Sequence, residues 1–524
     1  MTHPLSLVAA IGVVFALPST SRAQSPFAPH LRWTHAPASG EAWLPSGLEF
    51  AAGGELLWSS GQGLHPRAQL FSTAPILAGA ALDPLRAELL AGAYATVGVS
   101  AGASESELFT AAQYIGFDAA HRRTEIAKYD ARAGSFAPLW RHTMGLVGNG
   151  ASKFAAARDG AQLVCATHDA QFQVLSVEWL DGADGALRLQ RASYAGTLRQ
   201  LAATADPSRV ALSVGSELRV LDDAGTSLLA TGMPSATNAL AFAGNGSRLA
   251  FGFGAQVRVM SDVDGLYVLT RDVASAPGEV ATRVSLSDDG ATLAIGWWNA
   301  VDTRTVRLQV WDLAHDILRY ERVVAAPGTG LQNYVEAALV GRDGHTAAFG
   351  CWGTADAQPE VLVVDVESGQ ESLVLDLPGS VRALALDPSG TRVAVGTKAT
   401  HANQFSATGD VRLYDTGRRR TQLVEAPVVG GPLHVAARES GATRILFYVG
   451  ARSAAPLAFP GGGQWWIVRQ GAKRYLRATD SAGRADLVLY LGPAAAGADL
   501  AIQTVARTPG GARLGTNVVE PVVF

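Results

Sequence analysis

Residues 283–312 read RVSLSDDGATLAIGWWNAVDTRTVRLQVWD, and two other stretches of the chain repeat this arrangement. Residues 381–415 read VRALALDPSGTRVAVGTKATHANQFSATGDVRLYD, and residues 238–262 read NALAFAGNGSRLAFGFGAQVRVMSD. Each copy has an alternating strand, a tight Asp/Asn/Gly turn, a strand that ends in a small residue, a loop, and a strand that ends in Asp. A strand-rich unit that recurs every 40–55 residues or so is typical of β-propeller blades. The repeats therefore predict an all-β propeller.

Two positions of the repeat have a physical explanation. Near the centre of a ring of sheets there is little room, and this suits the small residues that end the second strand: Ala166, Ser213, Gly252, Gly296, Gly350 and Gly396. The turn before that strand contains an Asx residue and in most copies Gly, which suits a tight hairpin because the Asx side chain caps the turn and Gly accepts a positive φ.

The repeats set the expected domain organisation. We count eight candidate blades, at residues 41–80 and 90–143 and then starting near residues 150, 196, 236, 279, 332 and 379. Seven blades is the alternative, because the first repeat could partly be a strand that completes the last sheet. Residues 433–524 lack the repeat and read as short strands separated by Gly and Pro, which predicts a small β-sandwich module. We thus expect a signal peptide at 1–23, a propeller at 24–430 and this module at 433–524.

Over residues 41–430 this pattern resembles the WD40-like propeller family. Trp311-Asp312 is a literal Trp-Asp pair at the end of a third strand, and other copies have Tyr-Asp, Leu-Asp or Val-Asp there. The Gly-His pair that feeds the hydrogen-bond tetrad of eukaryotic members is absent, so the resemblance implies the fold and no particular partner. The last 90 residues or so resemble C-terminal β modules of exported proteins from planctomycete-like bacteria.

The composition excludes some functions. The chain of 524 residues has 42 basic and 46 acidic residues, a balance that gives no support for binding to nucleic acid or to an anionic membrane. Only four of the basic residues are Lys; together with the abundance of Ala, this indicates a bacterium with a GC-rich genome. With 48% hydrophobic and 17% charged residues, the chain is typical of a folded protein.

The N-terminus has the features of an export signal. Residues 5–17 (LSLVAAIGVVFAL) form an apolar run of signal-peptide length that is too short to cross a bilayer, and Ser21 and Ala23 occupy the −3 and −1 positions of a cleavage site. The alternative is a buried N-terminal strand. We expect an exported protein that is periplasmic, cell-surface or extracellular, does not span a membrane and is a monomer.

The two cysteines are expected to be buried free thiols. An exported protein can form disulfides, but Cys165 and Cys351 fall in equivalent strands of distant repeats. Their Cα atoms would therefore lie farther apart than the roughly 7 Å that a disulfide allows.

No motif predicts a catalytic residue, a cofactor or a metal site. Residues 98–102 (GVSAG) match the G-x-S-x-G nucleophile elbow, but strands flank this segment, whereas the elbow joins a strand to a helix. There is no H-E-x-x-H, no paired C-x-x-C, no EF-hand loop and no repeated Ala-Gly-Trp docking motif. Trp465 and Trp466 are expected in the core of the C-terminal module.

The loops between second and third strands form the best candidate binding surface. They are long at residues 117–124, 297–305, 352–360 and 397–410, whereas the turns expected at the opposite face are short. Long loops on a rigid scaffold are common binding sites, and Trp and Arg are favoured at interfaces. The candidate binding residues are Trp297, Trp298, Asp302, Arg304, Trp352, Asp356, His121, Arg122, His401, Asn403 and Gln404. Trp297 has an alternative interpretation as core, because it aligns with Phe253 and Cys351.

Two functional hypotheses follow. The first is a non-catalytic binding or scaffold protein whose long-loop face takes a protein or a glycan. The second is an enzyme of the lactonase, lyase or glycan hydrolase type that uses the central funnel. Acids that converge in the funnel with shifted pKa values would favour the second hypothesis, and a funnel lined by small and aliphatic residues would favour the first.

Overall fold

The computed structural model describes the greater part of the chain. The described residues are 11–12, 31–38, 41–51, 54, 56–62, 67–73, 80–89, 95–101, 107–114, 123–130, 137–144, 153–168, 175–194, 196–325, 332–354, 358–367, 369–416, 420–423, 432–438, 443–458, 464–467, 472–479, 484–491, 500–507 and 513–519. Within these ranges the regular structure is entirely β, and no helix is present that could cross a membrane. The chain divides into two compact units, Pro29–Thr416 and Met1–Ala28 with Gly417–Phe524.

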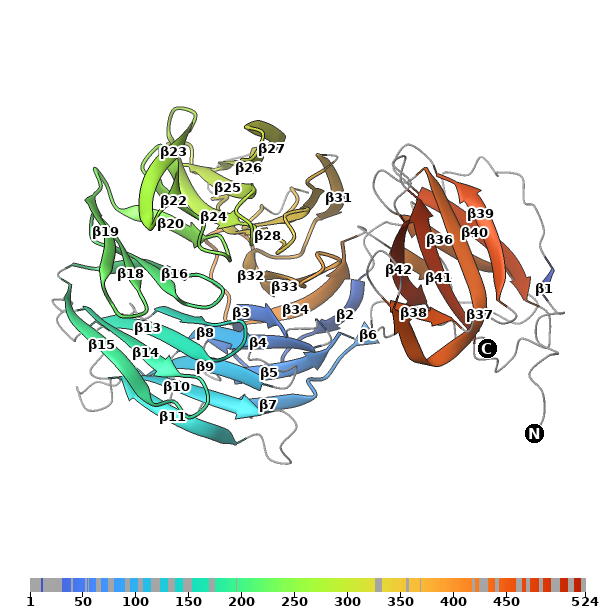
Figure 1. The fold of residues 1–524 in the computed structure, drawn as a ribbon, viewed down its shortest axis with the longest axis horizontal. Coiled ribbons are helices and arrows are strands. Elements are labelled where there is room, and N and C mark those ends of the chain that lie inside the picture. The colour runs from blue at the N-terminus through green and yellow to red at the C-terminus, as the bar shows by residue number, and fades with distance from the viewer. Residues whose placement is uncertain are drawn as a thin grey trace. The chain divides into compact units, whose positions relative to one another are not determined.

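The unit Pro29–Thr416 consists of successive antiparallel sheets, each built from consecutive strands (Figure 1). In chain order the sheets are β3 (Leu44–Phe50), β4 (Leu56–Gln62), β5 (Arg67–Ser72) and β7 (Arg86–Leu89); β8 (Ala95–Ala101), β9 (Glu107–Tyr114), β10 (Arg123–Asp130) and β11 (Pro138–Met144); β12 (Lys153–Ala156), β13 (Gln162–His168), β14 (Leu175–Asp181) and β15 (Leu187–Tyr194); β16 (Leu198–Ala203), β17 (Arg209–Val214), β18 (Glu217–Asp222) and β19 (Ser227–Gly232); β20 (Thr237–Phe242), β21 (Arg248–Phe253), β22 (Gln256–Val263) and β23 (Leu266–Ala274); β24 (Glu279–Leu286), β25 (Thr292–Asn299), β26 (Thr305–Asp312) and β27 (Ile317–Ala325); β28 (Val335–Val340), β29 (Thr346–Cys351), β30 (Val361–Asp365) and β31 (Gln370–Leu375); and β32 (Val381–Leu386), β33 (Arg392–Lys398) and β34 (Gly409–Asp415). Their first strands begin within five residues of the predicted repeat starts.

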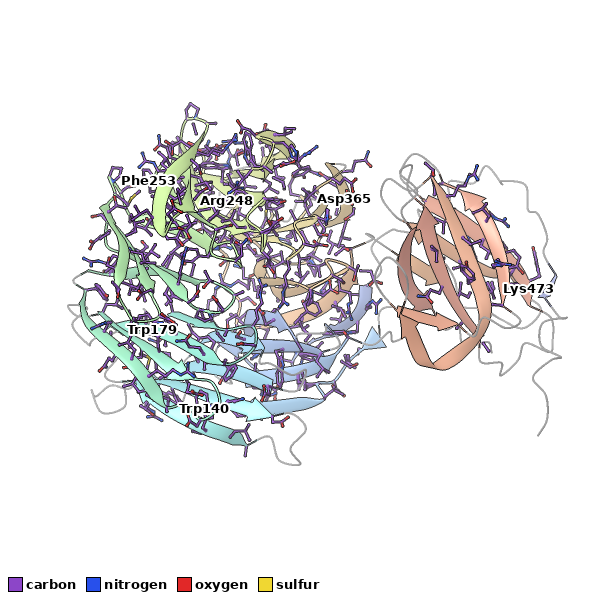
Figure 2. The ribbon with its side chains drawn as sticks, viewed as in Figure 1. Trp140, Trp179, Arg248, Phe253, Asp365 and Lys473 are labelled. Atoms are coloured by element: carbon purple, nitrogen blue, oxygen red, sulfur yellow. The ribbon has the colours of Figure 1, made fainter. Side chains whose placement is uncertain are left out.

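The sheets follow one another around a ring. The first strands β3, β8, β12, β16, β20, β24, β28 and β32 contact one another in this order, and β32 contacts β3 again. This radial arrangement of small antiparallel sheets is consistent with a propeller. Large side chains fill the space between neighbouring sheets; Trp179 and Phe253 are two of them (Figure 2).

The small residues predicted to end the second strands lie inside those strands, where one sheet meets the next; β25 continues past Gly296 to Asn299, and β33 continues past Gly396 to Lys398. A Cβ atom added to Gly296 would lie 2.5 Å from Cγ1 of Val335 in the following sheet, and one added to Gly350 would lie 2.6 Å from Cγ1 of Val381. A Cβ on Gly396 would lie 2.7 Å from Cβ of Pro45 in the first sheet of the ring. Since real Cβ atoms do not approach other atoms so closely, the absence of a side chain lets the sheets pack together.

The tight turns have the predicted chemistry. Asp289 Oδ1 accepts a hydrogen bond from the amide of Ala291 at 2.9 Å, and Asn245 Oδ1 accepts one from Ser247 at 2.9 Å. In the turns that contain a glycine, this glycine has a positive φ, 72° at Gly290. These turns specify the first hairpin of each repeat.

A strand from the N-terminal side completes the last sheet. β2 (Leu31–His35) pairs antiparallel with β34, and β6 (Ala80–Ala81) pairs parallel with β2. Arg32 Nε lies 2.6 Å from Asp415 Oδ1, so an ion pair reinforces the junction. The sequence left open whether a strand of the first repeat completes the last sheet. The strand that pairs with β34 is β2, which precedes the first repeat.

The second unit has two sheets that share one core. One sheet has the order β1 (Ile11–Gly12), β40 (Arg484–Leu491), β36 (Pro432–Arg438) and β35 (Arg420–Leu423); the other has the order β38 (Gln464–Ile467), β37 (Arg444–Ala458), β41 (Leu500–Arg507) and β42 (Arg513–Val519), and β39 (Lys473–Ala478) pairs with β37. Alternate residues from both sheets are buried together, including Val435, Leu487, Phe447 and Ile502. β35 pairs with β36, in keeping with the division of the two units between Thr416 and Gly417.

The N-terminal apolar run is described only at Ile11 and Gly12, which pair with Leu491 and Tyr490 of β40. These two residues form a strand, as in the alternative interpretation of the N-terminal run. The signal peptide itself stays a prediction.

Both cysteines are buried and free, as the repeat register predicted. Burial raises the pKa of the Cys351 thiol to about 12, and it raises the pKa of the Cys165 thiol further. Neither thiol is therefore an ionised nucleophile at neutral pH.

Candidate functional site

An aromatic cluster lies at the long-loop face, the end of the ring formed by the loops between second and third strands. Trp298 is the next-to-last residue of β25, Tyr334 directly precedes β28, and Trp352 directly follows β29. The ring of Tyr334 lies 5.6 Å from that of Trp298 and 5.2 Å from that of Trp352. All three side chains are half-buried, so each keeps an accessible part. The structure thus brings together two tryptophans that the sequence singled out.

Positive charge is in excess beside this cluster. Glu336 Oε2 accepts a hydrogen bond from Trp352 Nε1 at 2.9 Å, and its carboxylate lies 2.9 Å from Arg283 and 3.7 Å from Arg382. Lys398 Nζ lies 5.6 Å from the centre of the Trp352 ring.

Two lysines of this end are electrostatically coupled to Glu336 and to the neighbouring arginines. Burial, and secondly the charge of Arg283, lowers the pKa of Lys153; burial, and secondly the charge of Arg382, lowers the pKa of Lys398. Four cationic side chains from β12, β24, β32 and β33 therefore surround one carboxylate. Such a group attracts acidic ligands.

The loop between β33 and β34 is tied down by buried groups. Lys398 Nζ donates a hydrogen bond to the carbonyl of Gln404 at 2.9 Å and another to the carbonyl of Ala402. His401 Nδ1 lies 3.4 Å from Oε1 of Glu360, a carboxylate with no exposed surface. Phe405 on the same loop is 89% exposed. A fixed loop thus carries an exposed aromatic side chain.

Other predicted residues have different places. Trp297 is fully buried and its indole donates to Gln309 Oε1 at 2.9 Å, so it is core and cannot contact a ligand. Asp302 caps its own loop, because its carboxylate accepts hydrogen bonds from the amides of Arg304 and Thr305. Arg304 is partly exposed in this loop, and Asn403 and Gln404 are exposed in the loop before β34.

His121, Arg122 and Asp356 lie outside the described residues. The side chains of Trp465 and Trp466, the expected core pair of the C-terminal module, also lie outside the described part.

Sequence reasoning missed Tyr334, Glu336, Arg283 and Arg382. They lie in or just before first strands, whereas the predicted binding residues were taken from the loops between second and third strands. The available signal was the position of polar and aromatic residues near the start of first strands, where side chains face the opening of the ring.

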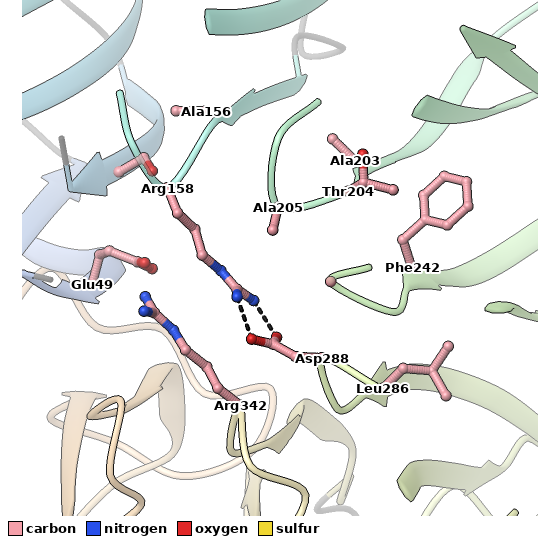
Figure 3. Close-up of a pocket in the computed structure, with 12 residues that line it drawn as sticks. Glu49, Ala156, Arg158, Ala203, Thr204, Ala205, Phe242, Leu286, Asp288 and Arg342 are labelled. Atoms are coloured by element: carbon pink, nitrogen blue, oxygen red, sulfur yellow. Dashed lines mark hydrogen bonds and ion pairs between the residues drawn. The ribbon is translucent and has the colours of Figure 1, made fainter. Parts of the chain in front are cut away.

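A second feature is a cavity of about 240 Å³ on the axis, near the ends of the first strands (Figure 3). Residues from seven successive repeats line it: Glu49, Ser100, Ala156, Arg158, Ala203, Thr204, Ala205, Phe242, Gly244, Leu286, Asp288 and Arg342. Arg158 forms a two-point ion pair with Asp288, which comes from a sheet three places farther around the ring.

Glu49 and Arg342 are the remaining charged groups of this cavity. Burial raises the pKa of Glu49 to about 7, against the opposing influence of Arg342 and Arg158. Burial, and secondly the charge of Arg158, lowers the pKa of Arg342. Neither side chain has a hydrogen bond or an ion pair within 4.0 Å among the described residues.

The G-x-S-x-G match is not a nucleophile elbow. Ser100 lies inside β8, where it pairs with Phe109 of β9, and the next described element after β8 is the strand β9. Ser100 lines the cavity, but no histidine is among the lining residues. In the described part of the chain, no three His, Cys, Asp or Glu side chains are placed to hold a metal ion.

Comparison with solved structures agrees with this geometry. The chain is similar to Sqt1 of Chaetomium thermophilum, a WD40-type propeller protein, with a TM-score of 0.52 and 12% identity over 73% of this chain and 97% of that chain. The fold is a WD40-like β-propeller.

In total, 1282 chains of known structure are similar to this propeller chain. A fold so widely shared does not identify a function. No protein family and no curated protein matches the sequence.

Proposed function

We propose that this protein is an exported, non-catalytic binding or scaffold protein whose ligand docks on the long-loop face. In this proposal the propeller has eight blades, the C-terminal unit is a β-sandwich, and the mature protein is a monomer. Export is supported by the apolar run at residues 5–17 and by the residues at the expected cleavage site.

The observation that carries the proposal is the half-buried cluster of Trp298, Tyr334 and Trp352 at one end of a rigid ring. Aromatic side chains with one accessible part supply contact area at little cost in conformational entropy. The cations beside the cluster favour an acidic ligand, either an acidic protein segment or a glycan that carries carboxylates.

The test is binding of the purified mature protein to an array of acidic glycans and acidic peptides, followed by affinity measurements on the selected hit. Trp298→Ala and Trp352→Ala should each weaken binding by about tenfold or more, as expected for interface anchors. Trp140→Ala is the matched control, because Trp140 is a half-buried tryptophan of the outer strand β11 and should leave the affinity unchanged. Unchanged binding in both Trp298→Ala and Trp352→Ala would show that the site is assigned wrongly.

Salt provides a second readout of the same surface. Because cations surround Glu336, affinity for an acidic hit should fall as NaCl is raised, and Arg382→Gln should reduce the slope of that dependence. Binding that is insensitive to salt would argue against an acidic ligand.

One observation favours the competing enzyme hypothesis. Glu49 is an acid with a raised pKa in the central cavity, as a general acid requires. Hydrolysis of a glycoside needs a second available carboxylate, however, and Asp288 is held by Arg158. Turnover of a lactone or glycan by the wild type that is lost in Glu49→Gln would support the enzyme.

A further inference from the structure

The axial cavity contains one cation, Arg342, whose side chain forms no ion pair within 4.0 Å among the described residues. Arg158 and Asp288 neutralise each other through their two-point ion pair. Arg342 makes no such pair, and Figure 3 shows its guanidinium between Glu49 and the Arg158–Asp288 pair. An arginine that lines a cavity without a partner offers a planar set of N–H donors suited to a carboxylate.

The charge of Glu49 decides what this arginine can bind. The groups that face Glu49 are Arg158, Arg342 and Asp288, from the ends of β12, β28 and β24. With Glu49 protonated, the four side chains carry one net positive charge. A ligand with one negative charge would neutralise this positive charge, whereas a ligand with two would leave one negative charge uncompensated in the cavity.

We propose that this cavity binds a small monocarboxylate, with Arg342 holding the carboxylate by two parallel hydrogen bonds and the neutral carboxyl of Glu49 donating a third. Apolar and hydroxyl groups supply the remaining wall: Ser100, Ala156, Ala203, Thr204, Phe242 and Leu286. These residues leave room for a short alkyl tail. None of them carries a positive charge that could balance a second acidic group on the ligand. The site is separate from the long-loop face, so its failure and that of the proposed function are distinguishable.

Ionisation of Glu49 opposes this ligand, because two carboxylates would then compete for Arg342. Burial raises the pKa of Glu49 to about 7. The affinity for a monocarboxylate should therefore be nearly constant well below this pH and fall by roughly tenfold for each pH unit above it.

The experiment measures binding of sodium propionate to the full chain by calorimetry and by ligand-observed NMR at about pH 6 and about pH 8, since these values bracket the ionisation of Glu49. We expect saturable binding that is about tenfold weaker at the higher pH. Propionamide, which lacks the charge, and sulfate, which carries two charges, should bind at least tenfold more weakly than propionate at the lower pH.

Three variants complete the test. Arg342→Gln should reduce propionate affinity by tenfold or more, and Glu49→Gln should bind with the same affinity at both pH values because its amide cannot ionise. Arg188→Gln, which removes an arginine from an exposed ion pair with Asp181, should behave like the wild type.

Several results would overturn the proposal. They are a wild type that does not bind propionate at tens of millimolar, equal binding of sulfate, and a Glu49→Gln variant that keeps the pH dependence. If Arg342→Gln fails to fold, the pH profile of Glu49→Gln still decides.

Discussion

Glu360 is a carboxylate sealed inside the propeller. Its Oε2 accepts a hydrogen bond from the amide of Leu377 at 2.5 Å, and its other oxygen lies 3.4 Å from His401 Nδ1. Burial raises its pKa from 4.5 to about 8, although the hydrogen bond from Leu377 acts in the opposite direction. The folded protein therefore binds a proton at this site more tightly than the unfolded chain does.

This preference predicts a pH-dependent stability. An acid whose pKa is raised by folding stabilises the fold fully below its unfolded pKa, and this contribution is lost as pH rises from about 4.5 to about 8. Glu360→Gln should remove this loss, because an amide does not ionise. The free energy of unfolding of the variant minus that of the wild type, measured by urea unfolding, should therefore be about 2–4 kcal/mol larger at pH 8 than at pH 5.

The matched control is Glu367→Gln, because Glu367 is exposed and a change there should shift stability equally at both pH values. Parallel pH profiles for the wild type and Glu360→Gln would contradict the assigned burial of the charge.

At this scale the sequence could identify residue types but not their surroundings. Trp297 and Trp298 are adjacent, and strand alternation sends one into the core and leaves the other half-buried. The pattern alone allowed either assignment. His401 was predicted as a binding residue, but its ring lies against Glu360, 41 residues earlier and in the preceding sheet. Such a contact depends on how two sheets pack, which no local pattern encodes.

Among the strands, the close approach of one sheet to the next gives the clearest constraint. Gly296 lies inside β25, and a Cβ there would lie 2.5 Å from Cγ1 and 3.0 Å from Cβ of Val335. Both of these atoms belong to β28, a first strand that is itself fixed by its neighbours on either side.

Gly296→Ala should therefore destabilise the propeller by about 1–3 kcal/mol through overpacking, as seen when methyl groups are forced into a packed core. Gly232→Ala is the matched control, because Gly232 is also a strand residue, the last of β19, but a Cβ there meets no atom within 4 Å and its φ is not positive. Chemical denaturation should show a loss for Gly296→Ala and less than about 0.5 kcal/mol for Gly232→Ala, as for a surface change. Equal losses would mean that the small column does not set the sheet spacing.

The strands of one repeat were predictable because their signals are local. Alternation, an Asx-Gly turn and a small terminal residue all lie within about 25 residues, and the first strands begin close to the predicted positions. After the last repeat the signals are weaker: β35 follows the final Asp415 and pairs with β36 of the second unit. Nothing in the four residues of β35 indicates which sheet they join.

In the molecule as a whole, stability depends on how the ring closes. β2 supplies the outer partner of β34, and Trp33 of β2 is fully buried against Phe71 at a ring distance of 5.1 Å. The sequence offered no means to assign this strand, because five residues near one end pair with a strand about 380 positions later. Closure by a strand from the other end of the chain joins the first and last repeats into one cooperative structure.

This closure can be tested by comparing a chain that lacks residues 1–28 with one that lacks residues 1–36. The two differ by β2, so the shorter chain loses the buried Trp33, the ion pair of Arg32 with Asp415, and the partner of β34. Loss of a buried Trp alone costs about 3–5 kcal/mol. The shorter chain should therefore unfold at clearly lower urea, and it should self-associate through the open edge of β34. If both chains unfold at the same urea concentration and remain monomeric, β2 does not close the ring, and the first and last repeats must be held together by their first strands alone.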